Sequence, residues 1–425
     1  MFGLSRQWML AVLLTAVCSY VAFQVFGDAR SSDLMAMWLA GKFLHSGQTE
    51  LVYMTDETVF SMQVDPAWYD YMAETYQHSE PLFPFIYPPL WAWLAGLFQD
   101  ISFFALEPYA TALNAALLGG IALLGARIAG QGVSPVLYVF LCLLCFFLTQ
   151  IGTVALYENQ PQILVSFLIL LALERARNGS ETTAGLAMAL AASLKVYPAL
   201  LALLWLATGQ RRAFFSFAAA GALLGLLSIA VAGWPLHQQF IEQMGRVAAS
   251  SIVSALNWNV HAVVAQLFYR DELVLLSVPG SAASWYLYAK PVLWTLLTQI
   301  APFLLLALAF PLFRRADADT RDLALWPAFM IVLAMLAPIA WAYHFLPAIA
   351  LLPSVLGVLG TRFGTAAILA FITLLGWPTG TLYRWAGFEL LGLQLWSTVL
   401  ILCIAAWFVH RARAGLLISK ESAAP

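Results

Sequence analysis

Long apolar stretches alternate with short polar ones along almost the whole chain. An α-helix satisfies its own backbone hydrogen bonds in hydrocarbon and crosses a bilayer in about 20 residues, so these stretches predict membrane spans. We therefore expect an all-α fold: a polytopic transmembrane helical bundle with about 11–13 membrane segments, forming one domain over residues 1–425. The expected segments are 8–26, 88–106, 108–128, 135–155, 161–176, 181–195, 197–209, 213–232, 286–312, 322–340, 343–360, 364–380 and 388–410.

Two long connections interrupt this pattern, at residues 27–86 and 234–285. Basic residues cluster instead at the ends of apolar stretches, which by the positive-inside rule marks the cytoplasmic face. The first connection is acidic, and helix counting puts the second on the same side, so both are expected to form one extracytoplasmic surface. If 88–106 and 108–128 both crossed, Arg127 would lie outside, so one of them is expected to be re-entrant or interfacial. The basic residues are Arg127, Arg175, Arg177, Arg211, Arg212, Arg314, Arg315, Arg321, Arg362, Arg411 and Arg413.

Composition narrows the possible functions. Hydrophobic residues make up 62% of the 425 residues and charged residues only 10%, against roughly 25% charged in an average soluble domain. The net charge of −2 gives no indication of nucleic-acid binding. All four cysteines lie in apolar stretches, so no disulfide framework is expected. An ionisable group inside such a chain costs at least about 2.5 kcal/mol at mid-bilayer, and is therefore a functional candidate.

Asp33 lies just past the end of the first apolar stretch, in "GDARSSDLMAMWLAGKFLHSG". Ser31, Ser32 and Asp33 precede an amphipathic segment, so Asp33 could serve as a helix N-cap. The helix that follows would lie along the membrane interface. A carboxylate in this place could also act as a general base, and the two roles are compatible.

Two cationic candidates lie at the outer ends of apolar segments. Lys195 comes just before a break at Pro198 and has no acidic neighbour within several residues. Broken helices at membrane depth require protein or a water-filled cavity to cover the freed backbone. Lys195 therefore either snorkels to the interface or awaits a bound phosphate. His344, in "APIAWAYHFLPAIALLP", is either packed among aromatic residues or part of the same site.

Further polar residues lie next to helix starts or in the second connection. Each of these residues could instead have a purely structural role, as part of an aromatic belt, a capping turn or core packing. Gly221 and Gly225 have helix-packing spacing, and we expect only that role of them. The additional candidates for contacts with a ligand are Tyr87, Glu158, Asn159, Gln160, Asn257 and His261.

The ordered segments resemble the GT-C superfamily of polyprenol-phosphate-sugar-dependent glycosyltransferases, and most closely glycosyltransferase family 87, the bacterial mannosyltransferase-like group. The resemblance covers roughly residues 31 to 353. The usual Gly-Gln-x-Asn pattern stands here as Asn159-Gln160-Pro161-Gln162. The matching segments are "SDLMAMWLAGKFLHSGQTELVY", "FIYPPLWAWL", "ENQPQILVSFLILLALERAR", "GLAMALAASLKVYPALLALLWL" and "APIAWAYHFLPAIALLP".

This resemblance implies a GT-C type fold and an inverting hexosyltransferase, with mannose as the expected sugar. Asp33 would be the base, with Asp28 as the second choice, and Lys195 and His344 would bind the donor phosphate. The partners would be a polyprenyl-phosphate sugar, a glycolipid or glycan acceptor and membrane lipids, but no nucleic acid. A monophosphate donor offers little reason for a metal clamp, so we expect no metal and no cofactor. The expected location is the bacterial inner membrane, with the active site on the extracytoplasmic side.

Two other function classes remain open from the sequence. A transporter or lipid flippase also uses broken helices and buried charge, although the chain contains no evident inverted repeat and its two long loops suit an enzyme. A structural assembly subunit would leave Asp33 and Lys195 without a role.

Overall fold

The computed structural model describes residues 6–53, 59–130, 133–276, 285–376, 380–381 and 390–421. Proline begins many helices, among them α4, α6 and α10, because its fixed φ suits the first turn and its missing N–H is not needed there. From the N-terminus to the first strand, the α-helices are α1 (Arg6–Phe26), α2 (Ser32–His45), α3 (Pro66–Tyr76), α4 (Pro89–Gly96), α5 (Phe103–Ala129), α6 (Pro135–Leu148), α7 (Gln150–Tyr157), α8 (Gln162–Arg177), α9 (Glu181–Leu194), α10 (Pro198–Ala207), α11 (Arg211–Ala232) and α12 (Trp234–Ala249).

The remaining part of the chain combines a small sheet with further helices. The strands β1 (Ser250–Val253), β3 (Trp285–Ala289) and β2 (Val274–Leu276) form an antiparallel sheet in that order, in which Ile252 and Val274 both pair with Leu287. The other elements are α13 (Val260–Phe268), α14 (Val292–Arg315), α15 (Ala318–Thr320), α16 (Trp326–Leu336), α17 (Leu346–Ile349), α18 (Leu356–Leu375) and α20 (Leu390–Glu421), with short 3-10 or π segments at Thr49–Leu51 (η1), Arg270–Glu272 (η3), Arg321–Leu325 (η4), Ala342–Phe345 (η5) and Leu352–Val355 (η6).

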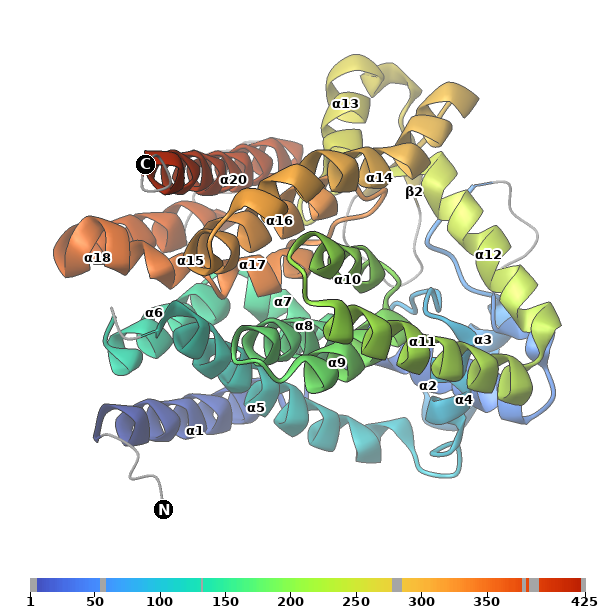
Figure 1. The fold of residues 1–425 in the computed structure, drawn as a ribbon. Helices are drawn as coiled ribbons and strands as arrows, with labels where there is room; N and C mark the ends of the chain where they lie inside the picture. The colour runs from blue at the N-terminus through green and yellow to red at the C-terminus, as the bar shows by residue number, and fades with distance from the viewer. Residues whose placement is uncertain are drawn as a thin grey trace.

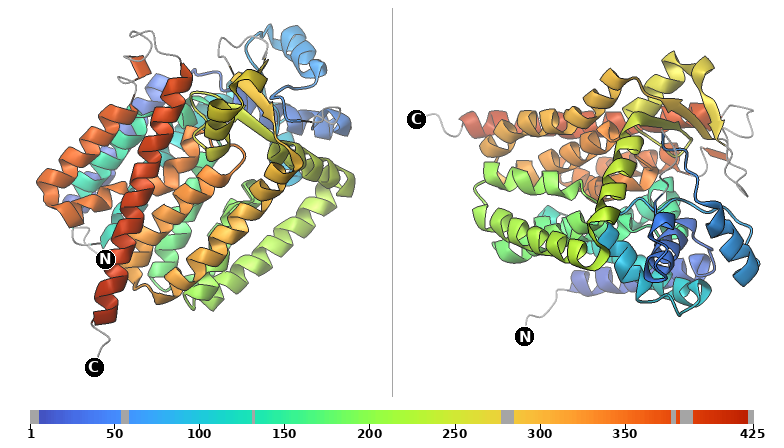
Figure 2. Two further views of the ribbon diagram at one scale, coloured as in Figure 1. Left: turned by 90° about the horizontal axis from the view of Figure 1, so that it is seen from above. Right: turned by 90° about the vertical axis from the view of Figure 1, so that its right-hand side faces the viewer.

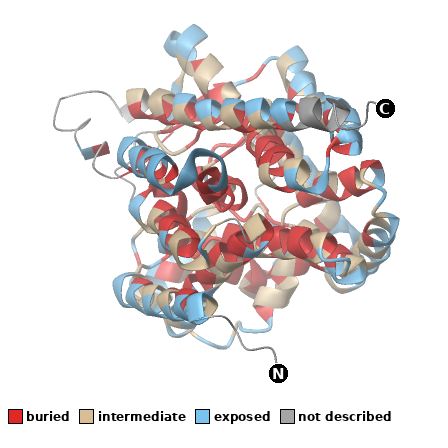
Figure 3. Ribbon diagram, turned by 60° about the vertical axis from the view of Figure 1, so that its left-hand side comes forward, coloured by how far each residue is buried: buried red, intermediate tan, exposed pale blue. Residues whose placement is uncertain are grey.

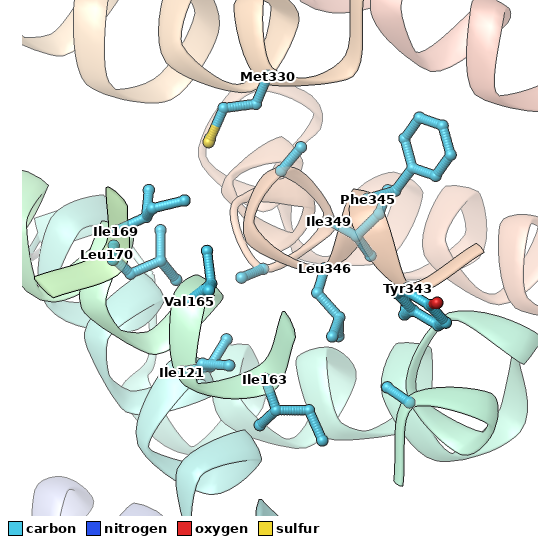
Figure 4. Packing of buried hydrophobic residues seen from close by; sticks show 14 of the residues in the cluster. Ile121, Ile163, Val165, Ile169, Leu170, Met330, Tyr343, Phe345, Leu346 and Ile349 are labelled. Atoms are coloured by element: carbon cyan, nitrogen blue, oxygen red, sulfur yellow. The ribbon is translucent and has the colours of Figure 1, made fainter. Parts of the chain in front are cut away.

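The core combines short helices with the long helix α5, which contributes Leu118 and Ile121, and the other long helices surround it. Ile163 and Ile169 of α8 are fully buried and pack with Ile349 of α17 in the central cluster (Figure 4). By contrast, α11 and α14 expose most of their apolar side chains, such as Leu223 and Leu308, on the outside (Figure 3). Exposed apolar surface of this kind suits contact with lipid, so the outer helices are the ones that face the bilayer.

Six helical stretches in the described part of the chain are long and apolar enough to cross a membrane. The other segments expected from the sequence are shorter, and a helix of 14 residues, such as α6, rises only about 21 Å at 1.5 Å per residue. The six are Arg6–Phe26, Phe103–Ala129, Arg211–Ala232, Val292–Arg315, Leu352–Leu375 and Gly392–Ala414.

The expected span 88–106 does not form as one helix, which explains the position of Arg127. The helix α4 has only eight residues and packs against α2. At their contact a Cβ on Gly41 would clash with the backbone of Gly96. The crossing is made by α5, which extends from Phe103 to Ala129, so Arg127 reaches the same end of the bundle as Arg175, where both bond Glu174 at 2.7 and 2.5 Å.

Both long loops lie at one end of the molecule, away from the chain termini (Figure 1). We call this the loop end. Phe60 and Met62 of the first loop pack with Ile252 and Leu287 of the sheet, and the backbone N–H of Phe60 donates to Ser250 Oγ at 2.8 Å. The long helices run from this end to the opposite one (Figure 2). The two loops are therefore in contact with each other at the loop end.

The opposite end carries a network of ion pairs, and we call it the arginine end. Arg177 at the end of α8 bonds Asp319 and Asp322, both at 2.6 Å. Gln210, just before α11, donates to the carbonyl of Ala176 at 3.1 Å, so the α10–α11 turn lies at this end too. These contacts join elements distant in sequence and hold the bundle together at the face away from the loops.

Candidate active site

A cavity of about 350 Å³ lies at the loop end, where segments from both halves of the chain meet. Most of its wall is apolar, including Phe83, Leu200 and Leu333. Polar groups enter from five separate parts of the chain. They are Asp33, Tyr87, Gln160, Lys195, Tyr197, Trp341, Tyr343 and His344.

Asp33 lies in the first turn of α2, on the cavity wall. The N-cap of α2 is Ser31 and not Asp33, so the carboxylate is not used for capping its own helix. Gln160 Nε2 donates a hydrogen bond to Asp33 Oδ2. Burial raises the pKa of Asp33 to about 6, against the opposing effects of the Gln160 hydrogen bond and the charge of Lys195. A carboxylate with such a pKa is well placed to accept a proton near neutral pH.

Gln160 and Tyr87 fix the orientation of this carboxylate. The Tyr87 hydroxyl donates to Gln160 Oε1 at 3.2 Å, so the amide nitrogen of Gln160 is the group that faces Asp33. Tyr87 is itself held because the Tyr53 hydroxyl donates to its carbonyl oxygen at 2.5 Å. Both Tyr87 and Gln160 are almost completely buried. This series of hydrogen bonds uses one carboxylate oxygen of Asp33 and leaves the second oxygen available to a ligand.

Lys195 enters the cavity from the break between α9 and α10. Its backbone is extended (φ −136°, ψ 128°), which ends α9 before Pro198 begins α10. Its Nζ lies 5.7 Å from the ring centre of Tyr87 and 5.3 Å from that of Tyr343, distances at which the face of an aromatic ring attracts a cation. The break therefore points the ammonium group into the cavity, and its charge acts on Asp33.

His344 meets Lys195 from the far end of the sequence. Its Nε2 lies 3.4 Å from Lys195 Nζ, and its Nδ1 lies 3.2 Å from the carbonyl oxygen of Trp341. A carbonyl only accepts and an ammonium only donates, so a neutral ring with its proton on Nδ1 satisfies both contacts. In this form Nε2 has no hydrogen to offer. While Nδ1 donates to Trp341, His344 can donate to an anion from Nε2 only after it gains a proton, and burial and the charge of Lys195 lower its pKa well below the usual range.

Glu158 and Asn159 lie beside the cavity but do not line it. Glu158 Oε2 accepts the backbone N–H groups of Ser32 and Asp33, at 3.0 and 3.3 Å. Asn159 Nδ2 donates to Thr111 Oγ1 at 2.8 Å and Ser31 Oγ at 3.3 Å. Both residues therefore contact the segment that carries Asp33.

The structure does not bring Asn257 and His261 to the cavity. Asn257 is fully buried, donates to the carbonyl of Ile252 at 2.6 Å and accepts the N–H of Ala340 at 2.8 Å. His261 Nδ1 accepts the indole N–H of Trp294 at 2.9 Å, and its Nε2 lies 3.1 Å from the carbonyl oxygen of Leu336. Both side chains are occupied in joining the second loop to the bundle.

Sequence reasoning missed three residues that matter at this site. Tyr343 lies under Lys195, and Trp341 lines the cavity beside it. Glu107 of α5 accepts the N–H and the hydroxyl of Ser31, the latter at 2.7 Å. Glu107 could have been recognised as an acidic residue near the start of an apolar stretch. The expected span 108–128 began one residue after it, so it was not considered.

This arrangement combines a base and cations in an apolar cavity. A carboxylate of raised pKa can take a proton from a hydroxyl group, and an ammonium group a short distance away can stabilise an anion that forms opposite. Apolar walls surround both groups. The site is therefore suited to a substitution at carbon in which the leaving group is anionic.

Comparison with known proteins gives one family. The model of glycosyltransferase family 87 matches residues 85–338, which include Tyr87, Gln160 and Lys195, whereas Asp33 and His344 lie outside it. No individual curated protein matches the chain. Because the family match covers more than half of the chain, and six helices in its described part are fit to span a membrane, this multi-pass membrane protein belongs to glycosyltransferase family 87.

Proposed function

We propose that the chain is an inverting glycosyltransferase that moves a hexose, mannose, from a polyprenyl-phosphate donor to a lipid-linked or polysaccharide acceptor. The observation that carries this proposal is the pairing, in one apolar cavity, of the Asp33 carboxylate with the Lys195 ammonium group. A phosphate attached to an isoprenoid chain needs a cation next to apolar walls, and the acceptor hydroxyl needs a base. The cavity offers both.

In the proposed reaction, an acceptor hydroxyl oxygen attacks the anomeric carbon from the face opposite the phosphate. The hydroxyl proton moves to Asp33 as the new C–O bond forms. The bond between the anomeric carbon and the phosphate oxygen breaks, and its electron pair leaves with polyprenyl phosphate. Lys195 stabilises the negative charge that grows on this oxygen. His344 accepts from Lys195 at Nε2 while it is neutral, the form that its burial and the charge of Lys195 favour, and a bound phosphate has to offset both effects before the imidazolium contacts it.

A second cavity supports the lipid nature of the donor. It has a volume of about 440 Å³, is bordered by α4, α9, α11 and α12, and shares Pro88, Val196 and Phe240 with the first cavity. Gly221 and Gly225 line it, and a Cβ on either would meet nothing within 4 Å. The spacing of these glycines suggested that they pack α11 against a neighbouring helix, but they do not. The space they leave is suited to an isoprenoid chain that reaches the bilayer.

The assay that tests this function uses purified protein and polyprenyl-phosphate-mannose, with free polyprenyl phosphate as the measured product. We expect release to require an acceptor and to be lost in Asp33→Asn. Polyprenyl-phosphate-glucose and a nucleotide-activated mannose serve as alternative donors. Equal turnover of the nucleotide donor would overturn the lipid-phosphate assignment.

The proposed lipid path has its own test in Gly225→Leu. Filling the second cavity should raise the KM for a long-chain donor and leave that for a short-chain analogue unchanged. Gly245→Leu is the matched control, because Gly245 is exposed on α12, also has open space around a Cβ and does not line either cavity. An equal effect of Gly225→Leu on both donors would contradict the path.

The transporter and flippase alternative makes a different prediction. A flippase would move the donor lipid across reconstituted vesicles without breaking its glycosidic bond, so neither the wild type nor Asp33→Asn would release polyprenyl phosphate. Membership of a glycosyltransferase family favours the enzyme. Vesicles with donor on one side, assayed for both translocation and polyprenyl phosphate, separate the two functions.

We further propose that the loop end is extracytoplasmic and that the protein resides in the bacterial inner membrane. Single cysteines at Thr75 and Asp271, both exposed at the loop end, should react with an impermeant maleimide in intact cells. A cysteine at Arg212, at the arginine end, should react only after lysis. The native cysteines are replaced first, because Cys403 is exposed. The reverse labelling pattern would invert the topology.

A further inference from the structure

The first turn of α2 is capped by carboxylates from other helices. The first N–H groups of a helix have no partner within it and are commonly bonded by the side chain of the N-cap residue. Here the N-cap Ser31 makes no such bond, because its hydroxyl donates to Glu107 at 2.7 Å. The next two N–H groups, of Ser32 and Asp33, are bonded by Glu158. The backbone of Asp33 is therefore fixed by a residue far away in sequence.

The turn between α7 and α8 is shaped to place Glu158 and Gln160 together. Asn159 between them has a left-handed backbone (φ 46°), which asparagine tolerates better than most residues. Its side chain is held by Thr111 and by Asn114, whose Nδ2 donates to Asn159 Oδ1 at 3.0 Å. As a result Glu158 bonds the backbone of Asp33, and Gln160 bonds its side chain.

We propose that Glu158 is a positioning residue for Asp33, which caps the first turn of α2 and acts through Asp33 and not by contact with the sugar donor or acceptor. The proposal rests on the base role given to Asp33 under the proposed function. It replaces the expectation that Glu158 contacts the donor or the acceptor, because Glu158 does not line the cavity. Any displacement of α2's first turn would misalign the base, and such misplacements cost catalysis more than binding.

This role requires hydrogen-bond acceptors and not a negative charge. Burial and the nearby charge of Asp33 raise the pKa of Glu158 to about 8, so near neutral pH Asp33 is the ionised member of the pair. A protonated carboxyl group still accepts two N–H groups through its carbonyl oxygen. The other titratable groups that interact with this pair are Glu107, Tyr87, Tyr157, Lys195, Tyr343 and, through Lys195, His344.

The test compares Glu158→Gln with Glu158→Ala. Glutamine keeps an acceptor for the two N–H groups, so Glu158→Gln should retain kcat to within about threefold. Alanine removes the acceptor, so Glu158→Ala should lower kcat on the order of 10- to 100-fold with the donor KM unchanged. Glu74→Ala, an exposed glutamate on α3, is the matched control. A raised KM in both Glu158 variants would indicate a substrate contact and overturn the proposal, as would a kcat of Glu158→Gln as low as that of Glu158→Ala.

A double variant shows whether Glu158 acts through Asp33. In an Asp33→Asn background, adding Glu158→Ala should lower the residual kcat no further, because the positioned group no longer functions as a base. A merely structural role would instead lower the melting temperature and the yield of Glu158→Ala while leaving the kcat of the folded fraction at the wild-type value. That result, or a full additional loss in the double variant, would contradict the positioning role.

The two single variants separate failure of this inference from failure of the proposed function. If Asp33→Asn keeps wild-type turnover, the base assignment fails. If Asp33→Asn is inactive while Glu158→Ala keeps the wild-type kcat, the inference fails and the proposed function stands. Infrared difference spectra over a pH titration report separately on the protonation of Glu158, because the C=O stretch of its protonated carboxyl group should disappear in Glu158→Gln.

Discussion

The two long loops both place polar side chains at the loop end, but these side chains have different bonding partners. In the first loop Asp33 keeps an oxygen that faces the cavity, although Gln160 bonds the other one. In the second loop, the amide nitrogen of Asn257 donates to a backbone carbonyl, and its amide oxygen accepts from a backbone N–H and from Asn259. Buried polar groups are normally satisfied, so the informative group is the one with an unused atom directed at a cavity.

The two histidines repeat this contrast. His261 has both ring nitrogens bonded to the fixed groups Trp294 and Leu336. His344 has one nitrogen on a carbonyl and the other on Lys195, a side chain that a bound anion can draw away. The sequence presents both as lone histidines beside aromatic residues. Only the partners of the ring distinguish a residue that can respond to a ligand from one that joins two segments.

The largest expected effect is that of Asp33→Asn. The amide keeps the shape and can still accept from Gln160 Nε2, but it cannot take a proton, so turnover should fall about 10²- to 10⁴-fold with folding and donor binding preserved. Polyprenyl phosphate release and donor binding are both measured. Asp28→Asn is the control, since Asp28 is exposed and outside the cavity. Near wild-type turnover of Asp33→Asn would remove the difference between the two loops.

Lys195→Met should have the next largest effect. If Lys195 acts on charge that grows as the glycosidic bond breaks, kcat should fall on the order of 10²-fold. If it contacts the phosphate equally in the ground state, the donor KM should rise instead. His344→Ala combined with Lys195→Met should be non-additive, because their side chains are in contact. Small and additive effects in a steady-state assay would return both residues to an interfacial role.

Asn257→Ala should affect stability and not turnover. The change leaves the N–H of Ala340 and the carbonyl of Ile252 without their partner, and each unsatisfied buried group costs about 1–3 kcal/mol. We expect a lower melting temperature in detergent and an unchanged kcat per folded molecule. A fall in kcat at full stability would place Asn257 in the reaction after all.

The smallest effect is on the pH profile. A base must be ionised, and burial raises the pKa of Asp33 to about 6. As the pH falls through this value the protonated fraction grows, so kcat/KM should decline about tenfold per pH unit below it. An unperturbed aspartate would keep its activity down to about pH 4. A profile that is flat between pH 5 and 7 would show that Asp33 titrates as an exposed carboxylate.

Much of the fold followed from local sequence, and much of the site did not. The helical bundle, the two loops, the start of a helix at Asp33 and the break after Lys195 are set by apolar length and by proline, which act over a few residues. The boundary between α4 and α5 depends on the packing of α4 on α2. The contact of Lys195 with His344 and the bonds of Glu107 and Glu158 join distant segments, so no local pattern contains them.

The construction of the site from both halves of the chain has a consequence for biogenesis. Lys195 and His344 are separated by 149 positions, and at roughly 5–20 residues per second a ribosome needs about 7–30 s to make that interval. During this time Asp33, Glu158 and Lys195 already exist, but the wall that carries His344 does not. A growing chain therefore holds unsheltered charges at the membrane surface, and it becomes competent to bind its ligand only when the last third is inserted.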